Sequence, residues 1–479
     1  MNYKMIFNTL GKVLKIESML LVLPIIASLC YQEWNICLFI GLSAIISLIL
    51  GFLLTLTIKP KTTTIYAKEG FITVAFSWIA VSIISALPFT LSGEIPSFID
   101  ALFETVSGFT TTGATILTHP ENLSRGLLFL RSFNHFIGGM GILVFVMAII
   151  PQSNDKTIHV LRAEMPGPVV DKIVPRSKNT AKILYIIYIG MTALLTILLL
   201  CGGMNLFDSI THAFATAGTG GFSNYSTSIA NESAYIQWVI AIFMFLYGVN
   251  FNIYFLILIG KFKNAIKSKE LLTYFLITIV SIIIIALNIY PLFNNLHDTI
   301  RHSAFQVSSI ISTTGFTTQN INEWNSFAKF TLLILMFIGG CASSTAGGLK
   351  VFRVSILFKR ISYELKRLIH PNTVEVMTFD GKKIDEQTVN GVTSYFALYI
   401  AFILLATLLL SVDGLSIETN ITSAISCFNN IGPAFGSSAT DYTCYSGFSK
   451  IILTFAMLFG RLEIYPLLLA LSPYTWLKK

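Results

Sequence analysis

The sequence predicts an all-α polytopic membrane protein that carries a fourfold repeat behind an N-terminal two-helix hairpin. Of its 479 residues, 54% are hydrophobic and 12% are charged, whereas soluble domains carry about 25% charged residues. Nearly uncharged windows, among them 71–88, 183–201, 271–289 and 394–410, are long enough to cross a hydrocarbon core of about 30 Å. A short glycine-containing stretch recurs four times along the chain. From the apolar windows we count ten candidate spans.

The first two spans form the hairpin, which we place at residues 1–58. Its apolar runs, near 18–30 and 37–56, follow one another without a small-residue cleavage pattern. A removable signal peptide is therefore not indicated, and we expect the N-terminus to stay on the chain.

Basic residues gather in alternate loops, and this distribution orients the chain. Of the 32 Lys and Arg, 26 lie in the N-terminal tail, in 59–70, 151–182, 260–270 and 350–390, and at the last two positions. The exceptions are Arg125, Arg131, Arg301, Lys329, Lys450 and Arg461. We assign acids to the loops on the other side: Glu94, Asp100, Glu104, Asp208, Glu232, Asp298, Asp413 and Asp441. The positive-inside rule then places both termini in the cytoplasm. The basic stretch 350–367 is accordingly interpreted as a topology determinant, helped by anionic lipid, and not as a nucleic-acid site.

Cysteine and histidine give no sign of a metal site. The six cysteines have no paired spacing, and we interpret them as small packing residues, with Cys444 free on the outside. The seven histidines are scattered and form no H-E-x-x-H motif, so a metal-dependent enzyme has little support.

The recurring stretch reads "VSGFTTTGATIL" at 106–117, "FATAGTGGFSNYS" at 214–226, "ISTTGFTTQNIN" at 311–322 and "FNNIGPAFGSS" at 428–438. The aligned glycines, Gly113, Gly221, Gly315 and Gly432, lie roughly 100 residues apart, which indicates an internal repeat. Each unit has a span that leaves the cytoplasm, a segment too short to cross, a glycine loop and a returning span. We place the units at 59–160, 161–262, 263–370 and 371–479. All four are parallel, so all four loops lie near the outer side.

Four such loops around one axis predict a cation site in a central pore. Irregular backbone at membrane depth must be buried in protein or line a watery cavity, and glycine allows the dihedral angles that turn carbonyls inward. The negative ends of the preceding short helices favour a cation over an anion. The alternative is that these small residues only mediate close helix packing. The residues expected to bind the cation are Thr111, Thr112, Gly113, Thr219, Gly220, Gly221, Thr313, Thr314, Gly315, Asn430, Ile431 and Gly432.

Two features mark the second spans of units 3 and 4. The stretch "GGCASSTAGG" at 339–348 should break a helix, because each glycine costs about 1 kcal/mol relative to alanine; the alternative is a glycine-rich packing face. Arg461 follows Gly460 inside the last span and is interpreted as the deepest clear cation of the chain. Its burial costs at least about 2.5–3.5 kcal/mol, so it should face a cavity or a partner, unless it snorkels to a helix end.

With these motifs in place, the chain resembles the TrkH/TrkG/KtrB superfamily of potassium transporters over nearly its whole length. Further matching stretches are "FIGGMGILVFVMAIIP" at 136–151, "LRAEMPGP" at 161–168, "FIGGCASSTAGGLKV" at 337–351 and "FGRLEIYPLLL" at 459–469. The N-terminal hairpin and the "RAEMPGP" segment are closer to the TrkH branch than to KtrB. Departures are Pro433 after the fourth glycine and Ala114 after the first, where an apolar or aromatic residue is usual. Unequal loops fit a filter less strict than that of a fourfold-symmetric channel.

The resemblance implies four M1–P–M2 units around a K⁺ pore in a bacterial inner membrane, with 339–348 as an intramembrane gating loop. It also implies a homodimer that carries cytoplasmic TrkA-type subunits which bind NAD and ATP. The expected gate residues are Gly339, Gly340, Ser343, Ser344, Thr345, Gly347, Gly348, Lys350 and Arg461. For Lys350 the alternative is a position at the cytoplasmic end of its span.

Two other classes of function remain to be weighed. A Na⁺- or H⁺-coupled symporter would need acids at mid-membrane and inverted repeats, whereas the repeats here are parallel. An intramembrane hydrolase would need a nucleophile paired with a base, and Ser343 and Ser344 have no clear partner besides Lys350. No nucleotide-binding motif is present. We therefore expect a K⁺ uptake protein that is not an enzyme and holds no organic cofactor of its own.

Overall fold

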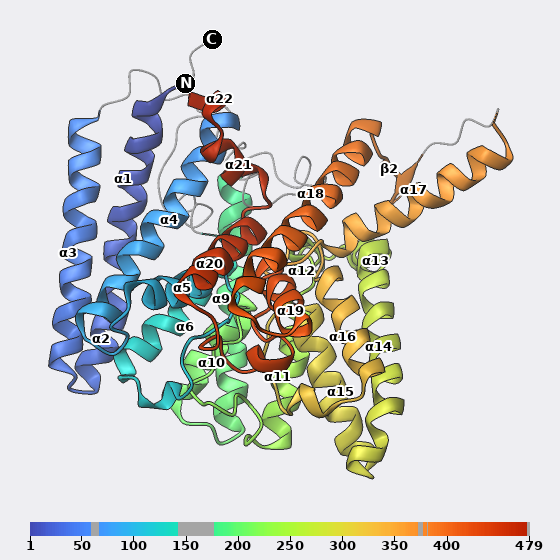
Figure 1. Ribbon diagram of the computed structural model, residues 1–479, viewed down its shortest axis with the longest axis horizontal. Coiled ribbons are helices and arrows are strands. Elements are labelled where there is room, and N and C mark those ends of the chain that lie inside the picture. Colours follow the sequence, from blue (N-terminus) through green and yellow to red (C-terminus); the bar gives the residue numbers. More distant parts are fainter. Residues whose placement is uncertain (59–66, 142–176, 372–376, 381, 477–479) are drawn as a thin grey trace.

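The computed structural model describes residues 1–479 except 59–66, 142–176, 372–376, 381 and 477–479. Helices make up nearly all of its regular structure (Figure 1). The exception among the described residues is a small antiparallel pair of strands, β1 (Thr378–Phe379) and β2 (Lys382–Lys383). The predicted all-α membrane fold is confirmed.

The N-terminal helices stand along one side of the molecule. α1 (Tyr3–Leu20) and α2 (Val22–Cys30) continue one another as a 28-residue span, and α3 (Trp34–Thr57) returns beside them. Glycines allow α1 and α3 to approach closely, because a Cβ built on Gly11 would lie 2.9 Å from the carbonyl oxygen of Gly51. The two ends of the chain meet on one face of the molecule, where Tyr3 stacks on Trp476 with ring centroids 5.8 Å apart. We call this face the inner side, after the orientation expected from the loop charges.

The rest of the chain repeats one order of elements four times: long helix, short helix, loop and second helix, and the second helix is interrupted in units 2, 3 and 4. Unit 1 has α4 (Ala67–Leu91), α5 (Phe98–Phe109), η1 (Pro120–Asn122) and α6 (Arg125–Gly139). Unit 2 has α9 (Ser177–Cys201), α10 (Leu206–Gly218), α11 (Ala234–Tyr247), α12 (Phe251–Leu258) and α13 (Phe262–Ile266). Unit 3 has α14 (Lys269–Phe293), α15 (Leu296–Ile311), η3 (Ile321–Glu323), α16 (Ser326–Ile338) and α17 (Val351–Ile369). Unit 4 has α18 (Glu386–Leu410), η4 (Ser411–Asp413), α19 (Ile417–Phe428), η5 (Gly436–Ser438), α20 (Gly447–Arg461), α21 (Tyr465–Leu471) and α22 (Pro473–Trp476).

Each short helix begins at a capping side chain. The oxygens of Ser97, Asn205, Asn295 and Ser416 accept backbone N–H groups in the first turns of α5, α10, α15 and α19. These contacts satisfy amides that would otherwise be unpaired at the start of a helix. With 12 to 16 residues, the short helices are less than a full span.

The second helices differ from expectation, since the sequence predicts an interruption in unit 3 alone. α11 and α12 meet at an angle of 91°, α16 ends before the loop to α17, and α20 ends at Arg461 before α21 begins at Tyr465. α6 likewise ends at Gly139. Among the described residues, six helices are long and apolar enough to span a membrane, or seven if the bent pair is one span. The ten candidate spans stay a prediction, because the returning helices of units 2 to 4 are interrupted and residues 142–176 lie outside the described part of the chain.

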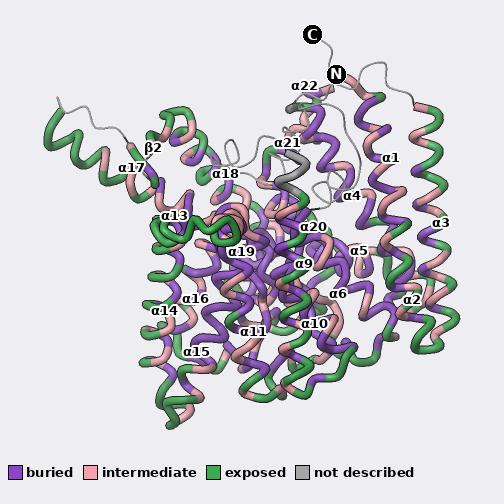
Figure 2. Tube along the Cα trace, turned by 180° about the vertical axis from the view of Figure 1, so that it is seen from behind, coloured by how far each residue is buried: buried purple, intermediate pink, exposed green. Residues whose placement is uncertain are grey.

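Burial is highest at the centre of the molecule. Most residues of the short helices are buried, whereas α3 and α14 expose many Leu, Ile and Phe side chains on their outer faces (Figure 2). Apolar exposure of this extent fits contact with lipid. All six cysteines are free; Cys341 and Cys427 are buried, as expected of packing residues, but Cys30 and Cys201 are exposed.

Candidate cation-binding ring and intramembrane loop

The four glycine loops share one backbone conformation. Two residues before each glycine, the chain adopts a left-handed conformation, with φ of 55° to 56° at Thr111, Thr219, Thr313 and Asn430. The glycines themselves have φ of 78° at Gly113, 74° at Gly221, 89° at Gly315 and 103° at Gly432. Non-glycine residues rarely adopt positive φ. The recurrence at equivalent positions shows that the loops form one kind of structure.

The loops meet in a closed ring, in the order of the sequence. A Cβ built on Gly113 would lie 1.8 Å from the Gly220 carbonyl oxygen, and one on Gly221 would lie 2.0 Å from that of Thr314. A Cβ on Gly315 would lie 2.0 Å from the Ile431 carbonyl oxygen, and one on Gly432 would lie 2.7 Å from that of Thr112. Each glycine therefore packs against the carbonyl that precedes the next glycine. Residues 111–113, 219–221, 313–315 and 430–432, which we call the glycine ring, include all twelve residues predicted to bind a cation.

The glycine ring separates two hollows. All four glycines line a recess on the outer side, together with Tyr225, Asp441 and Tyr442 among others. A second cavity lies on the inner side and is lined by Trp78, Gly347, Lys350, Asn430 and Arg461 among others. The ring is thus the constriction between an outer recess and an inner cavity.

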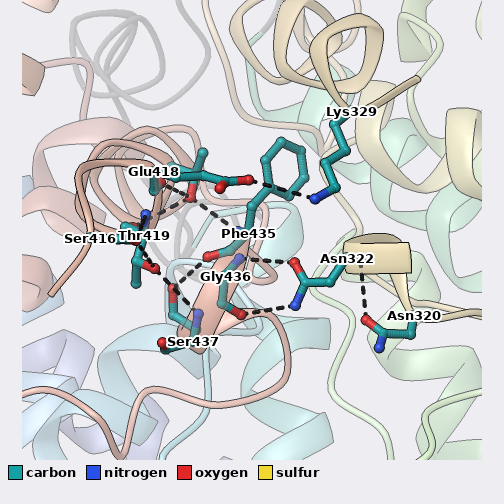
Figure 3. Close-up of polar contacts among 11 residues, drawn as sticks. Asn320, Asn322, Lys329, Ser416, Glu418, Thr419, Phe435, Gly436 and Ser437 are labelled. Atoms are coloured by element: carbon teal, nitrogen blue, oxygen red, sulfur yellow. Dashed lines mark hydrogen bonds and ion pairs between the residues drawn. The ribbon is translucent and has the colours of Figure 1, made fainter. Parts of the chain in front are cut away.

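Hydrogen bonds join the outer loops of adjoining units at every junction around the ring. They are Ser226 N to Glu121 at 3.0 Å, Ile229 N to Thr317 O at 3.1 Å, Gly436 N to Asn322 Oδ1 at 2.9 Å, and Tyr442 N to Thr115 O at 2.8 Å. At the junction of units 3 and 4, Asn322 also donates to the Gly436 carbonyl at 3.0 Å, and Lys329 lies 3.7 Å from Glu418 (Figure 3). These contacts fix the four loops relative to one another.

The loop between α16 and α17, residues 339–350, lies directly beneath the ring. Gly347 N donates to Thr313 Oγ1 at 2.6 Å, and a Cβ on Gly347 would lie 2.2 Å from the Asn429 carbonyl oxygen. Cys341 N donates to the Gly248 carbonyl at 2.9 Å, which holds the loop against the break between α11 and α12. The predicted interruption at 339–348 therefore reaches the inner face of the glycine ring.

The remaining gate candidates shape this loop. Gly339 and Gly348 have positive φ of 71° and 79° and pack against each other; a Cβ on Gly340 would lie 2.6 Å from that of Ala346. The Ser343 carbonyl accepts Phe251 N at 3.1 Å, and Ser344 Oγ donates to the Cys341 carbonyl at 2.6 Å. Thr345 Oγ1 donates to the Tyr247 carbonyl at 3.2 Å, and Lys350 Nζ donates to the Ala346 carbonyl. Ser344 thus closes a hydrogen bond within the loop, whereas the Ser343 carbonyl joins the loop to α12.

Arg461 contacts the loop through one arm of its guanidinium. Nη1 donates to the Thr345 carbonyl at 2.8 Å, whereas Nη2 donates to the carbonyls of Gly138 at 2.5 Å and Gly139 at 2.8 Å. The side chain therefore ties the intramembrane loop to the end of α6. A lipid-facing position for Arg461 does not fit these contacts.

Sequence reasoning missed Glu270, which anchors the same loop from α14. Its carboxylate is 5% exposed and accepts Ala342 N at 2.6 Å and Asn250 Nδ2 at 3.2 Å. In the sequence Glu270 stands beside the lysines of 260–270, a composition typical of a solvated loop. Its position in the first turn of a long span was the available signal.

Two of the acids assigned to outer loops are instead buried on short helices: Glu104 on α5, 1% exposed, and Asp208 on α10, 3% exposed. Arg131 Nε lies 2.5 Å from the Glu104 carboxylate. Arg131 is 2% exposed, whereas the exposure of Arg461 is intermediate, and nothing in the sequence indicated this second buried cation. Arg131 Nη1 also donates to the Ser223 carbonyl at 2.8 Å, and Glu104 accepts Ile116 N at 3.0 Å. The pair therefore braces the loops of units 1 and 2 behind the glycine ring.

Comparison with known proteins agrees with this architecture. The family model "TrkH: Cation transport protein" matches residues 39–476. The chain is 35% identical to the Trk system potassium uptake protein TrkH of Escherichia coli K12, over 99% of this chain and 100% of that protein. It is 33% identical to TrkG of the same strain, over 99% and 98% of the two chains. The crystal structure of the potassium transporter TrkH from Vibrio parahaemolyticus superimposes with a TM-score of 0.90 at 29% identity and covers both chains completely. The chain therefore belongs to the TrkH family of cation transport proteins, which are membrane transporters and not enzymes.

Proposed function

We propose that this chain takes up potassium ions across a bacterial inner membrane through a pore whose selectivity filter is the glycine ring. The observation that carries the proposal is the closed order of the ring, in which each glycine packs against the next unit's carbonyl. A ring of backbone carbonyls can replace the hydration shell of a cation. The names of the relatives, Trk potassium uptake proteins, support K⁺ as the transported ion.

The charge distribution around the ring favours a cation. The short helices α5, α10, α15 and α19 end at the ring, so their negative ends approach it. Asp441 lies in the wall of the outer recess. Arg461 and Lys350 line the inner cavity, where their positive charge opposes tight retention of a permeating cation.

The intramembrane loop is proposed as the gate. Gly347 contacts Thr313 of the ring, so the loop closes the inner exit of the filter. An open state requires the bond to Thr313 and the bond from Arg461 to Thr345 to break. In this proposal the loop controls flux and the ring controls selectivity.

The homodimer and the TrkA-type regulatory subunits remain proposals that rest on family membership. The helix α17 projects from the body of the protein and exposes Phe358, Ile361, Leu365 and Leu368 together with basic residues (Figure 1). That surface is available for assembly on the inner side. Mass measurement of the purified protein, with and without co-expressed nucleotide-binding subunits, tests both; a monomer that binds no such subunit would refute them.

Ion-coupled symport is the second candidate, and one observation favours it. Glu17 on α1 is 5% exposed, and its carboxylate accepts hydrogen bonds from Ser47 at 3.1 Å and Ser85 at 3.2 Å. Buried carboxyl groups of this kind mark coupling sites in many transporters. If coupling passes through Glu17, Glu17→Gln will remove the dependence of K⁺ uptake on external Na⁺ or pH. A channel without coupling will show no such dependence in either protein.

The filter is tested by replacing its glycines one at a time in protein reconstituted into liposomes. Each of Gly113→Ser, Gly221→Ser, Gly315→Ser and Gly432→Ser should lower the K⁺/Na⁺ flux ratio, because a side chain displaces the neighbouring carbonyl. Gly93→Ser is the matched control: Gly93 has the same φ as Gly113, 78°, but a Cβ there would meet nothing within 4 Å. An unchanged ratio in any two ring variants would refute the shared filter.

A further inference from the structure

The fourth quarter of the glycine ring differs from the other three in its contacts. Tyr442 Oη donates a hydrogen bond to the Gly432 carbonyl at 2.6 Å. Among the described residues, no hydrogen bond from within the chain reaches the carbonyls of Gly113, Gly221 or Gly315. One of the four glycine carbonyls is therefore already engaged by the protein.

The backbone of the fourth loop differs in the same place. Gly432 has the largest φ of the ring glycines, 103° against 74° to 89°. Its contact with the next unit is also the loosest: a Cβ on Gly432 would lie 2.7 Å from the Thr112 carbonyl oxygen, against 1.8 to 2.0 Å at the other junctions. Pro433 follows, so this loop also lacks the N–H that the other three have after the glycine. The fourth loop thus departs from the other three at Gly432, in its backbone angle, its packing and the residue that follows.

Tyr442 is held firmly enough to impose this difference. It is 1% exposed, its backbone N donates to the Thr115 carbonyl at 2.8 Å, and its ring packs on Phe103 and stacks with Tyr445. The residue lies in the wall of the outer recess that all four glycines share. Ten residues after the aligned glycine, where unit 4 has Tyr442, the other units have Leu123, Asn231 and Asn325.

We propose that Tyr442 sets the cation preference of the ring by withholding the Gly432 carbonyl, so that three glycine carbonyls instead of four coordinate the ion at this level. The inference deepens the proposed filter and rests on it. Selectivity for K⁺ over Na⁺ depends on the number and field strength of the coordinating carbonyls. The positive hydrogen of a donor that lies against a carbonyl oxygen offsets part of the negative potential which that oxygen presents to a cation. Fewer effective ligands disfavour the larger ion, which needs more oxygens around it.

Tyr442→Phe tests the inference, because it removes the hydroxyl and keeps the packed ring. The K⁺/Na⁺ flux ratio in liposomes should rise about fivefold, the factor that corresponds to about 1 kcal/mol for one hydrogen bond. Tyr445→Phe is the matched control, since its hydroxyl bonds to Asn420 at 3.1 Å and not to the ring; its ratio should stay at the wild-type value.

The sign of the change separates this role from a structural one. If Tyr442 only braces the loop, Tyr442→Phe will loosen the ring and lower the ratio, and that outcome overturns the inference, as does an unchanged ratio. Should Tyr442→Phe fail to fold, 3-fluorotyrosine at position 442 keeps the contact and strengthens the donor, and the ratio should then fall below wild type; a ratio at or above wild type overturns the inference.

The ring variants with serine distinguish failure of the proposed filter from failure of the proposed role of Tyr442. If they leave selectivity unchanged the filter itself is wrong, whereas if they lower it and Tyr442→Phe does not raise it, only the role of Tyr442 is wrong.

Discussion

Replacement of Arg461 by Gln should raise K⁺ flux and leave K⁺/Na⁺ selectivity unchanged. The guanidinium divides its hydrogen bonds between two elements, with one bond to Thr345 in the intramembrane loop and two to Gly138 and Gly139 at the end of α6. Of these three bonds, the one to Thr345 contacts the loop. A hydrogen bond to a charged group contributes about 1.5–3 kcal/mol. Its loss should therefore favour the open loop by about 10- to 150-fold, and flux should rise until another step limits it.

Arg461→Lys sharpens the test. An ammonium group keeps the charge but cannot reach both elements in the fixed geometry of a guanidinium. If simultaneous contact of the guanidinium with Thr345 and Gly138 is what matters, K⁺ flux in Arg461→Lys will equal that in Arg461→Gln. If charge alone matters, K⁺ flux in Arg461→Lys will equal that of wild type.

The assay is K⁺ and Na⁺ flux into liposomes at matched protein content, with thermal unfolding in detergent as a check on folding. Lys329→Gln is the control, since it removes a cation whose partner, Glu418, lies at an outer junction; its flux should not change. If Arg461→Gln is folded and conducts like wild type, Arg461 does not hold the gate and the inner cavity is not the gated exit.

Three further variants test neighbouring parts of the structure. Thr313→Val removes the acceptor for the N–H of the intramembrane loop, so K⁺ flux in liposomes should rise about fivefold, with lower flux contradicting the proposed gate. Glu104→Gln leaves Arg131 charged without its partner and should destabilise the protein by about 3–5 kcal/mol in detergent unfolding. The double variant Glu104→Gln with Arg131→Met should recover much of this stability, because no unpaired charge is left buried. A Glu104→Gln protein as stable as wild type would contradict the pairing. Gly138→Ala should lower stability, because its Cβ would lie 1.9 Å from the carbonyl at the end of α5, whereas Gly190→Ala, with nothing within 4 Å, should not; equal unfolding midpoints would contradict this packing.

The fold and the ring were predictable from sequence because they depend on local chemistry. Apolar segments mark the membrane spans, basic loops predict their orientation, and the four glycines show the repeat. Gly113 and its equivalents could be found because a carbonyl lies within 2.7 Å of the place where a side chain would be, so only glycine fits. The interruption at 339–348 was equally clear, since four glycines in ten residues do not continue a helix.

What escaped prediction depends on packing between distant segments. Thr111 and Asn430 have ordinary side chains, and their left-handed conformation is imposed by neighbouring units. Glu104 and Arg131 are charged residues in apolar surroundings, and nothing local shows that they meet. The breaks that follow α11 and α20 lie within apolar sequence, so hydropathy windows read through them.

Closure of the ring has a consequence for biosynthesis. Its last junction joins unit 4 to unit 1 through Asn430 and Thr112, which are 318 residues apart, and Lys450 bonds Asp100 across 350 residues. Contacts between such distant residues form late in folding. While the ribosome is still making unit 4, the first three units already lie in the bilayer with an open flank, where loop amides lack a neighbour and bare backbone is costly in lipid. The nascent chain must therefore be shielded there, by lipid headgroups, water or the insertion machinery, until the last helices emerge and complete the circle.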